Sequence, residues 1–120
     1  MDLCRIATVD SGGFPHCVPV SYLYDNGLIL IATVSSTKKV RNIRQNPECC
    51  VLVDVGGYGR GRGLMLQGRA RLVEGVGYLK VRRTIEGRTG WRLDEWKIEG
   101  RPPDSAIVFR PTSIVDIGRV

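Results

Sequence analysis

Hydrophobic and polar residues alternate in short segments over the first half of the chain, and turn-forming residues separate these segments. Alternation with a period of two, bounded by glycine, proline, asparagine or aspartate, is typical of β-strands. The pair Asn26-Gly27 after Asp25 predicts a tight hairpin turn. The strands that the pattern predicts lie at residues 5–9, 17–24, 28–34, 48–55 and 64–74. Five such strands with short connections favour a small, mainly β barrel over a doubly wound sheet.

The periodicity changes after Gly75. Apolar residues mixed with charges at helical spacing predict two short amphipathic helices, with residues 87–90 between them and residues 101–104 ending the second. Two closing strands are expected at residues 105–110 and 113–117, with Pro111 at an edge or a bend. No repeat or linker divides the chain, so we expect residues 1–120 to form a single domain with a modest core.

Residues 33–47 join the end of a predicted strand, a hydroxyl-rich turn and the start of a basic helix. Ser36 or Thr37 is expected to cap this helix, and Pro47 follows its end. Free backbone N–H groups at a helix start attract anions, hydroxyls donate hydrogen bonds, and Lys38 and Lys39 add positive charge. A capped basic helix is commonly only a solvated surface, but after a β-hairpin this segment is interpreted as a site for a cofactor phosphate.

The hairpin and this turn together carry a family resemblance. The motifs are Arg5-Ile6-Ala7-Thr8-Val9, Pro15-His16, Val18-Pro19-Val20, Asp25-Asn26-Gly27, Thr33, Ser36-Thr37-Lys38-Lys39 and Asn46-Pro47. With them the chain resembles the flavin-binding split-barrel family related to pyridoxamine 5′-phosphate oxidase. The resemblance covers nearly the whole chain and is most specific over residues 5–55. It implies a mainly β fold with short helices, a six-stranded Greek-key split barrel of the FMN-binding type, commonly a homodimer with two flavin sites at the subunit interface.

The resemblance also implies which residues hold the cofactor. The family's phosphate-binding run falls on Thr37-Lys38-Lys39, with Ser36 beside it, and Thr33 matches the threonine that ends the preceding strand. The strand whose backbone lies against the isoalloxazine ring falls on Val18, Pro19, Val20 and Ser21. FMN is therefore the expected cofactor, a deazaflavin coenzyme is the alternative, and haem is a third possibility because some related barrels bind it.

Three departures from the oxidase argue against pyridoxamine-phosphate oxidation. Cys17 stands where the oxidase has an arginine, and the glycine-rich segment 56–63 lacks its flavin-contacting glutamine, for which Gln67 is a candidate replacement. The chain also ends before the substrate-binding C-terminal segment of the oxidase. The expected function is flavin-dependent electron or hydride transfer between small molecules, on an unknown substrate. No catalytic side chain is assigned, since in flavin enzymes the cofactor supplies the redox chemistry.

The net charge of +6 raises a second hypothesis, a basic nucleic-acid-binding module. Its candidate contacts are Arg60, Arg62, Arg69 and Arg71, on and after the glycine-rich segment. Acidic residues interrupt the basic groups and no RNA-recognition or zinc-finger motif accompanies them, so nucleic acid is the less favoured partner. A third hypothesis is a dimeric scaffold that keeps the fold without a cofactor.

The remaining side chains favour structural interpretations. Four cysteines without CxxC spacing are expected to be buried free thiols, with Cys49 and Cys50 on opposite faces of a strand and no metal site. His16, the only histidine, is interpreted as a strand-edge residue, and Trp91 and Trp96 as core or dimer packing. Without a long apolar run or a signal-peptide pattern, we expect a cytoplasmic protein that does not enter the membrane.

Overall fold

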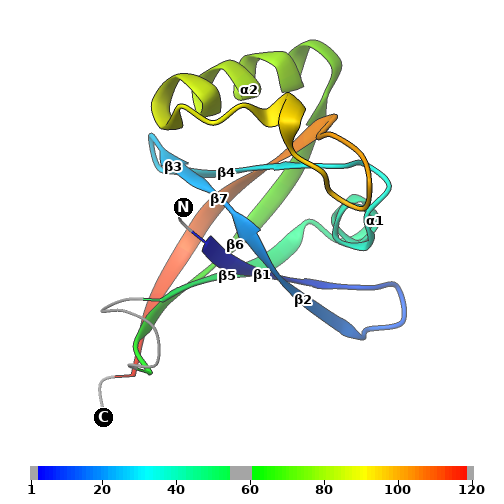
Figure 1. The fold of residues 1–120 in the computed structure, drawn as a ribbon. Helices are drawn as coiled ribbons and strands as arrows, with labels where there is room; N and C mark the ends of the chain where they lie inside the picture. The colour runs from blue at the N-terminus through cyan, green and yellow to red at the C-terminus, as the bar shows by residue number, and fades with distance from the viewer. Residues whose placement is uncertain (1–2, 55–60, 119–120) are drawn as a thin grey trace.

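The computed structural model describes residues 3–54 and 61–118, and these form one seven-stranded antiparallel sheet with two α-helices (Figure 1). Predicted residues Val55 and Arg60 and most of the glycine-rich segment lie outside the described residues. The strands are β1 (Leu3–Val9), β2 (Pro15–Ser21), β3 (Leu23–Asp25), β4 (Leu28–Thr33), β5 (Glu48–Asp54), β6 (Gly63–Glu74) and β7 (Ser105–Ile117). The helices are α1 (Lys38–Gln45), α2 (Gly75–Thr89) and the 3₁₀ helix η1 (Leu93–Glu95).

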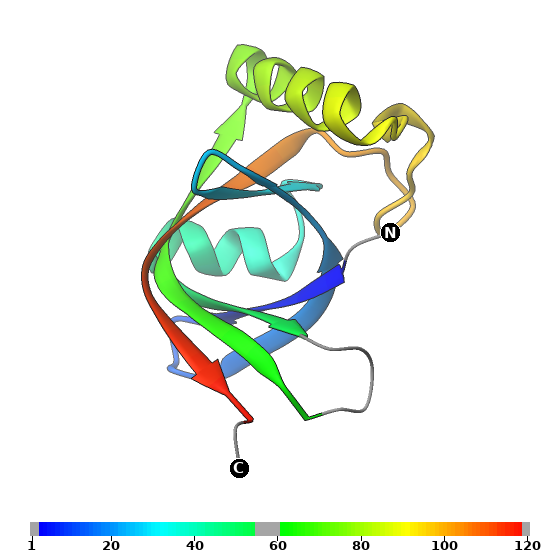
Figure 2. The same ribbon diagram turned by 90° about the vertical axis from the view of Figure 1, so that its left-hand side faces the viewer.

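The sheet curls into a split barrel. Its strand order is β2-β1-β5-β6-β7-β4-β3, and β2 comes close to β4 without being hydrogen-bonded to it in the sheet (Figure 2). The sheet has seven strands where the resemblance implies six, because the predicted strand 17–24 divides. Its first part, β2, pairs with β1, whereas β3 pairs with β4. The mainly β split barrel predicted from the sequence is confirmed.

The barrel interior holds the main core. The fully buried side chains there include Ile6, Ile31, Val51, Ile107 and Phe109. Helix α1 adds Val40 and Ile43 to this core. Beside them the Asn42 side-chain amide donates a hydrogen bond of 3.0 Å to the Thr8 hydroxyl, which fixes α1 against β1. The position of α1 is thus set by apolar burial and one buried polar link.

A second cluster lies on the outer face of the sheet under α2. Leu30, Val108 and Ile85 are buried there, and the two tryptophans pack against them with ring centroids 5.2 Å apart. The prediction of two helices in this region is wrong. Helix α2 continues to Thr89 because Gly90, with φ of 78°, is the residue that ends it. The Glu86 carboxylate accepts the Leu93 N–H at 2.8 Å, so the chain forms only η1 where the second helix was expected.

The last strand is continuous, which corrects the prediction of two closing strands. Strand β7 runs past Pro111 because the pairing with β6 shifts by one residue between Gln67 and Gly68. A Cβ atom at Gly68 would lie 2.1 Å from the Arg110 carbonyl oxygen, so the shift requires glycine. No helix among the described residues is long and apolar enough to cross a membrane.

Candidate functional site

The turn between β4 and α1 presents the start of a helix. The Thr37 backbone N–H donates to the Val34 carbonyl at 3.1 Å, and the Arg41 guanidinium donates to the Ser36 carbonyl at 2.6 Å. Thr37 stands at the N-cap position, as one of the two predicted candidates, but its hydroxyl donates to the Val34 carbonyl at 2.9 Å and does not cap the helix. The first N–H groups of α1 therefore have no side-chain acceptor, which suits an anion.

The two predicted lysines lie in different environments. Lys38 is exposed, and its ammonium lies 3.6 Å from an Asp10 carboxylate oxygen. Lys39 is only 8% exposed, and within residues 3–54 and 61–118 it forms no ion pair. Burial lowers the pKa of Lys39, while the charge of Glu99 acts in the opposite direction. A buried ammonium without a partner is costly, so an anionic ligand would stabilise it.

Thr33 has the second unsatisfied polar group of this region. Its side chain is fully buried, and its hydroxyl has no hydrogen-bond partner among the described residues. The backbone is nevertheless fixed, because the Thr33 carbonyl accepts the Asp104 N–H at 3.0 Å and the Ser105 hydroxyl at 3.2 Å. A buried hydroxyl without a partner next to an open helix start fits a site that a polar ligand completes.

The carboxylate of Asp104 binds another part of the turn between β4 and α1. Asp104 accepts hydrogen bonds from the Ser35 N–H at 2.8 Å and from the Ser35 hydroxyl at 3.0 Å. Burial acts to raise the pKa of Asp104, but these hydrogen bonds outweigh it and lower the pKa. Ser35 is thus engaged within the protein, whereas the predicted Ser36 is exposed. Contacts to a ligand are left to Ser36, Lys39 and the first turn of α1.

The four residues predicted to support the ring lie on β2, at one end of the sheet order. Val18 and Val20 pack against the barrel core, and Pro19 and Ser21 alternate with them on the other face. In the described sheet β2 is hydrogen-bonded only to β1, and it stands at one end of the strand order. Closure of the barrel brings β2 close to β4, the strand that ends at Thr33.

Sequence reasoning missed the segment that follows η1. Ser21 lines a cavity of about 210 Å³ with Trp96, Lys97 and Ile98. Ile98 and Arg101 exchange backbone hydrogen bonds of 2.7 and 3.1 Å around a tight turn. In this turn Glu99 and Gly100 have φ angles of 51° and 80°. The turn thus carries Glu99, whose charge acts to raise the pKa of Lys39, and it follows residues that share a cavity with the predicted ring strand. The Glu-Gly pair was its sequence signal.

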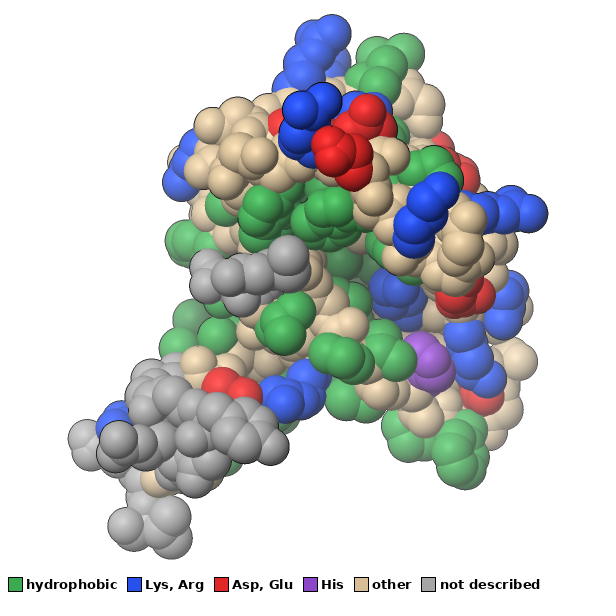
Figure 3. Space-filling model, in the orientation of Figure 1, with side chains coloured by type: hydrophobic (Ala, Val, Ile, Leu, Met, Phe, Trp, Pro, Cys, Tyr) green, Lys and Arg blue, Asp and Glu red, His purple; other side chains and the backbone are tan. Residues whose placement is uncertain are grey.

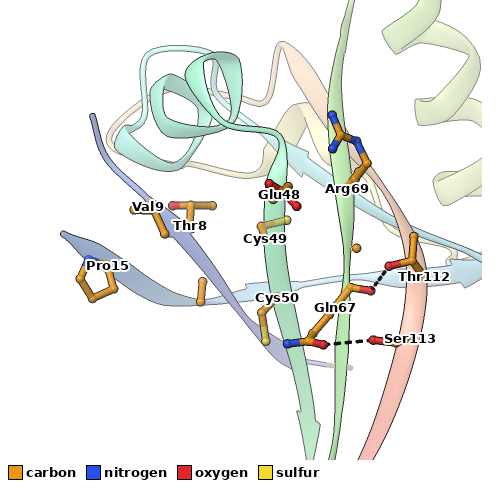
Figure 4. A pocket seen from close by; sticks show the side chains of 12 residues that line it. Thr8, Val9, Pro15, Glu48, Cys49, Cys50, Gln67, Arg69, Thr112 and Ser113 are labelled. Carbon is orange, nitrogen blue, oxygen red and sulfur yellow. Dashed lines mark hydrogen bonds between the residues drawn. The ribbon is translucent and has the colours of Figure 1, made fainter. Parts of the chain in front are cut away.

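Gln67, the candidate replacement for the flavin-contacting glutamine, lies outside the predicted cofactor site. It faces a cavity of about 500 Å³ between β1, β5, β6 and β7 (Figure 4), which shares no lining residue with the predicted cofactor site. There the Ser113 hydroxyl donates to its side-chain oxygen at 3.1 Å, and the Thr112 hydroxyl donates to its backbone carbonyl at 3.2 Å. Within one subunit, Gln67 is therefore separate from Thr33 and Lys39.

The cysteines are free thiols. Cys49 packs against the barrel core and Cys50 does not, which agrees with their alternation along β5, and both residues line the cavity of about 500 Å³. Burial raises the pKa of both Cys4 and Cys49 to about 12, which keeps these thiols protonated and unreactive. Cys17 is exposed, contrary to the general expectation of burial. The described residues contain no cluster of His, Cys, Asp and Glu able to hold a metal ion.

Similar proteins of known structure share this fold. An FAD-binding protein from Mesorhizobium loti has a TM-score of 0.76 and 23% identity, over 98% of this chain and 86% of that one. The haem storage protein HutZ from Vibrio cholerae has a TM-score of 0.76 and 16% identity, over 98% and 87%. An F420 reductase has a TM-score of 0.68 and 25% identity, over 95% and 89%.

No curated protein sequence matches this chain. The model of a protein family does match it, over residues 2–117, and that family is described as pyridoxamine 5′-phosphate oxidase. The match spans both the strand–turn–helix segment and the split barrel described above. The chain therefore belongs to the pyridoxamine 5′-phosphate oxidase family.

Proposed function

We propose that this protein binds FMN and acts in flavin-dependent electron or hydride transfer. The observation that carries the proposal is Lys39, a buried ammonium without an ion pair in the described residues, at the open N-terminus of α1. The FMN phosphate is a dianion, and it would supply the missing counter-charge. The fully buried Thr33 hydroxyl, also without a partner among the described residues, supports the same location.

Different residues would bind the phosphate and the ring of FMN. Lys39, the N–H groups of the first turn of α1 and the Ser36 hydroxyl would hold the phosphate, with Lys38 adding charge from the surface. The backbone of residues Val18 to Ser21 would bond the polar edge of the ring. The bound flavin supplies the redox chemistry, and the protein orients it and limits access of water. No side chain is assigned as a proton donor.

A deazaflavin coenzyme is the alternative cofactor. It carries a phosphate too, so Lys39 and α1 would serve it in the same way. The similar F420 reductase supports this alternative. The similar haem storage protein makes haem the third ligand to test. His16, the only histidine of the chain, has a buried Nδ1 atom without a hydrogen-bond partner in the described residues.

The proposal includes a homodimer that completes the cofactor sites. Its support is the apolar surface of β7, where Ile114, Val115 and Ile117 are 64%, 41% and 38% exposed. Val115 and Ile117 share one face of β7 and Ile114 lies on the other, and exposed apolar side chains of this kind favour burial against another chain. Light scattering of the purified protein after size-exclusion chromatography measures the mass, and a monomer with full cofactor affinity would contradict this part.

The test of cofactor binding compares ligands with and without a phosphate. The absorbance spectrum of the purified protein is recorded first, and colourless protein is then titrated with FMN, riboflavin, the deazaflavin coenzyme and haem. We expect FMN to bind more tightly than riboflavin, because riboflavin lacks the phosphate. Lys39→Met should weaken FMN by about 1.5 to 3 kcal/mol and leave riboflavin unchanged.

Lys38→Met is the matched control, because it removes the same charge from an exposed position. It should weaken FMN binding less than Lys39→Met does. Equal affinities for FMN and riboflavin would contradict the phosphate site. Tight binding of the deazaflavin coenzyme alone, or of haem alone, would reject FMN as the cofactor.

A further inference from the structure

A groove on the outer face of the sheet carries a second concentration of positive charge. Arg69 and Arg71 on β6 and Arg110 on β7 line a cavity of about 370 Å³. Its apolar lining includes Leu28, Pro47 and Val108. We refer to this cavity as the arginine groove. It shares no lining residue with the predicted cofactor site around Thr33, Lys39 and β2.

The sheet register brings the three guanidinium groups together. Arg69 lies directly opposite Arg110 in the β6–β7 pairing, and Arg71 lies two residues further along β6 on the same face. Like charges directly opposite one another on neighbouring strands destabilise a sheet. The register shift at Gly68 immediately precedes the Arg69–Arg110 pair and fixes it.

None of these three arginines forms an ion pair in residues 3–54 and 61–118. Glu48 is opposite Arg69 in the register, but the two side chains extend from their strands without pairing (Figure 4). Asp25 and Glu74 near the two ends of the groove are paired with Arg88 and Arg44 instead. The groove therefore carries three positive charges without an ion pair among the described residues, next to the carboxylate of Glu48.

On one face of the molecule the basic residues are dispersed. On the face in Figure 3, Lys and Arg side chains are scattered among acidic and apolar ones and form no continuous stripe. A nucleic-acid backbone requires a positive track longer than one groove. A concave site with three arginines and an apolar wall better fits a small ligand with clustered negative charges.

The geometry points to a binding site for a nucleoside diphosphate in the arginine groove. The guanidinium groups would bind the phosphate oxygens in pairs, since their planar donor arrangement matches phosphate. The base or ribose would lie against Leu28, Pro47 and Val108. A cavity of about 370 Å³ has the size of a small-molecule site. The inference does not depend on FMN binding, because the two sites share no residue.

The test is calorimetric titration of the protein with ADP at low and at physiological ionic strength. Adenosine is the ligand control, because it lacks the phosphates. ADP should bind, with an affinity that falls as salt increases, and adenosine should bind at least about ten-fold more weakly. Arg69→Gln and Arg71→Gln should each reduce ADP affinity about ten-fold or more.

Arg83→Gln is the matched protein control, because Arg83 is exposed on α2 outside the groove and has no ion pair in the described residues. It removes the same charge and should leave ADP affinity nearly unchanged. Lys39→Met and saturating FMN should also leave the ADP isotherm unchanged, which separates this site from the cofactor site. Thermal melting of each variant verifies that it folds.

Four outcomes would overturn the inference. They are no ADP binding at low ionic strength, equal binding of adenosine, equal losses in Arg83→Gln and Arg69→Gln, and competition between ADP and FMN. Binding of a single-stranded oligonucleotide without ADP binding would assign the groove to nucleic acid. A loss of dimer mass in Arg69→Gln, again without ADP binding, would assign it to contact with a second copy of the chain.

Discussion

The molecule has two positively charged regions that differ in how their charges are held. At the start of α1 a single ammonium, Lys39, is buried beside the unsatisfied Thr33 hydroxyl. In the arginine groove three guanidinium groups are exposed on the sheet. A buried charge has lost its hydration and gains strongly from one well-placed anion, whereas exposed charges remain hydrated and are screened by salt.

This difference teaches where specificity should arise. The candidate site at the start of α1, which we call the α1 site, offers fixed backbone donors and one buried charge. It should therefore discriminate between ligands with and without a phosphate. The groove relies on three exposed arginine side chains beside an apolar wall, so it should accept related polyanions with modest affinity and strong salt dependence. The following changes test this contrast.

The largest expected effect is a loss of stability at Gly68, the glycine that fixes the strand register of the arginine groove. Gly68→Ala would place a Cβ atom 2.1 Å from the Arg110 carbonyl oxygen, so the β6–β7 pairing must shift. We expect a loss of about 3 kcal/mol in the free energy of unfolding, measured by urea denaturation. Gly87→Ala is the control, since its Cβ meets nothing within 4 Å and helix propensity should stabilise it slightly. Equal stability of Gly68→Ala and the native protein would refute the role assigned to Gly68.

Lys39→Met should have opposite effects on FMN binding and on the stability of the protein without cofactor. It should weaken FMN binding by about 1.5 to 3 kcal/mol and also raise the melting temperature of the protein without cofactor. The stabilisation is expected because methionine removes a buried charge that has no ion pair among the described residues. Calorimetric melting with and without FMN measures both effects. A lower melting temperature without cofactor would mean that the charge is compensated in the folded protein.

The pKa of Lys39 predicts a pH dependence for the same site. Burial lowers this pKa in the folded state, so the unfolded chain binds more protons between the lowered value and the ordinary value of 10.5. Stability without cofactor should therefore rise with pH across that window, and FMN affinity should fall as Lys39 loses its proton. Chemical denaturation and FMN titration over alkaline pH would show both trends. Lys39→Met should remove the contribution of this lysine to both pH dependences. An unchanged pH profile in that variant would contradict the assignment.

A smaller effect is expected at the turn that holds Glu99. This carboxylate acts on Lys39 and would also repel a phosphate bound there. Glu99→Gln should therefore raise FMN affinity roughly two- to five-fold and leave riboflavin affinity unchanged. Glu95→Gln is the control, because Glu95 is exposed and paired with Arg92 at 3.0 Å. Equal changes in the two variants would show only a general effect of net charge.

The sequence predicted most of the fold, and it directed attention to the segment between β4 and α1 as the candidate site. Period-two alternation and the Asp25-Asn26-Gly27 turn indicated the barrel strands and the first hairpin, because these signals are local. The second predicted helix and the broken last strand were wrong for non-local reasons. Glu86 binds the Leu93 N–H across a loop, and pairing with β6 carries β7 past Pro111.

By itself the sequence determined the family, the split barrel and the identity of the basic residues of α1. Short motifs and the spacing of hydrophobic residues carry this information, and both can be recognised from residues that are close together in the chain. Only the tertiary structure decided that Lys39 is buried while Lys38 is exposed, that Glu99 acts on Lys39, and that Arg110 lies opposite Arg69. Burial and strand register depend on residues far apart in the chain, so no local pattern encodes them.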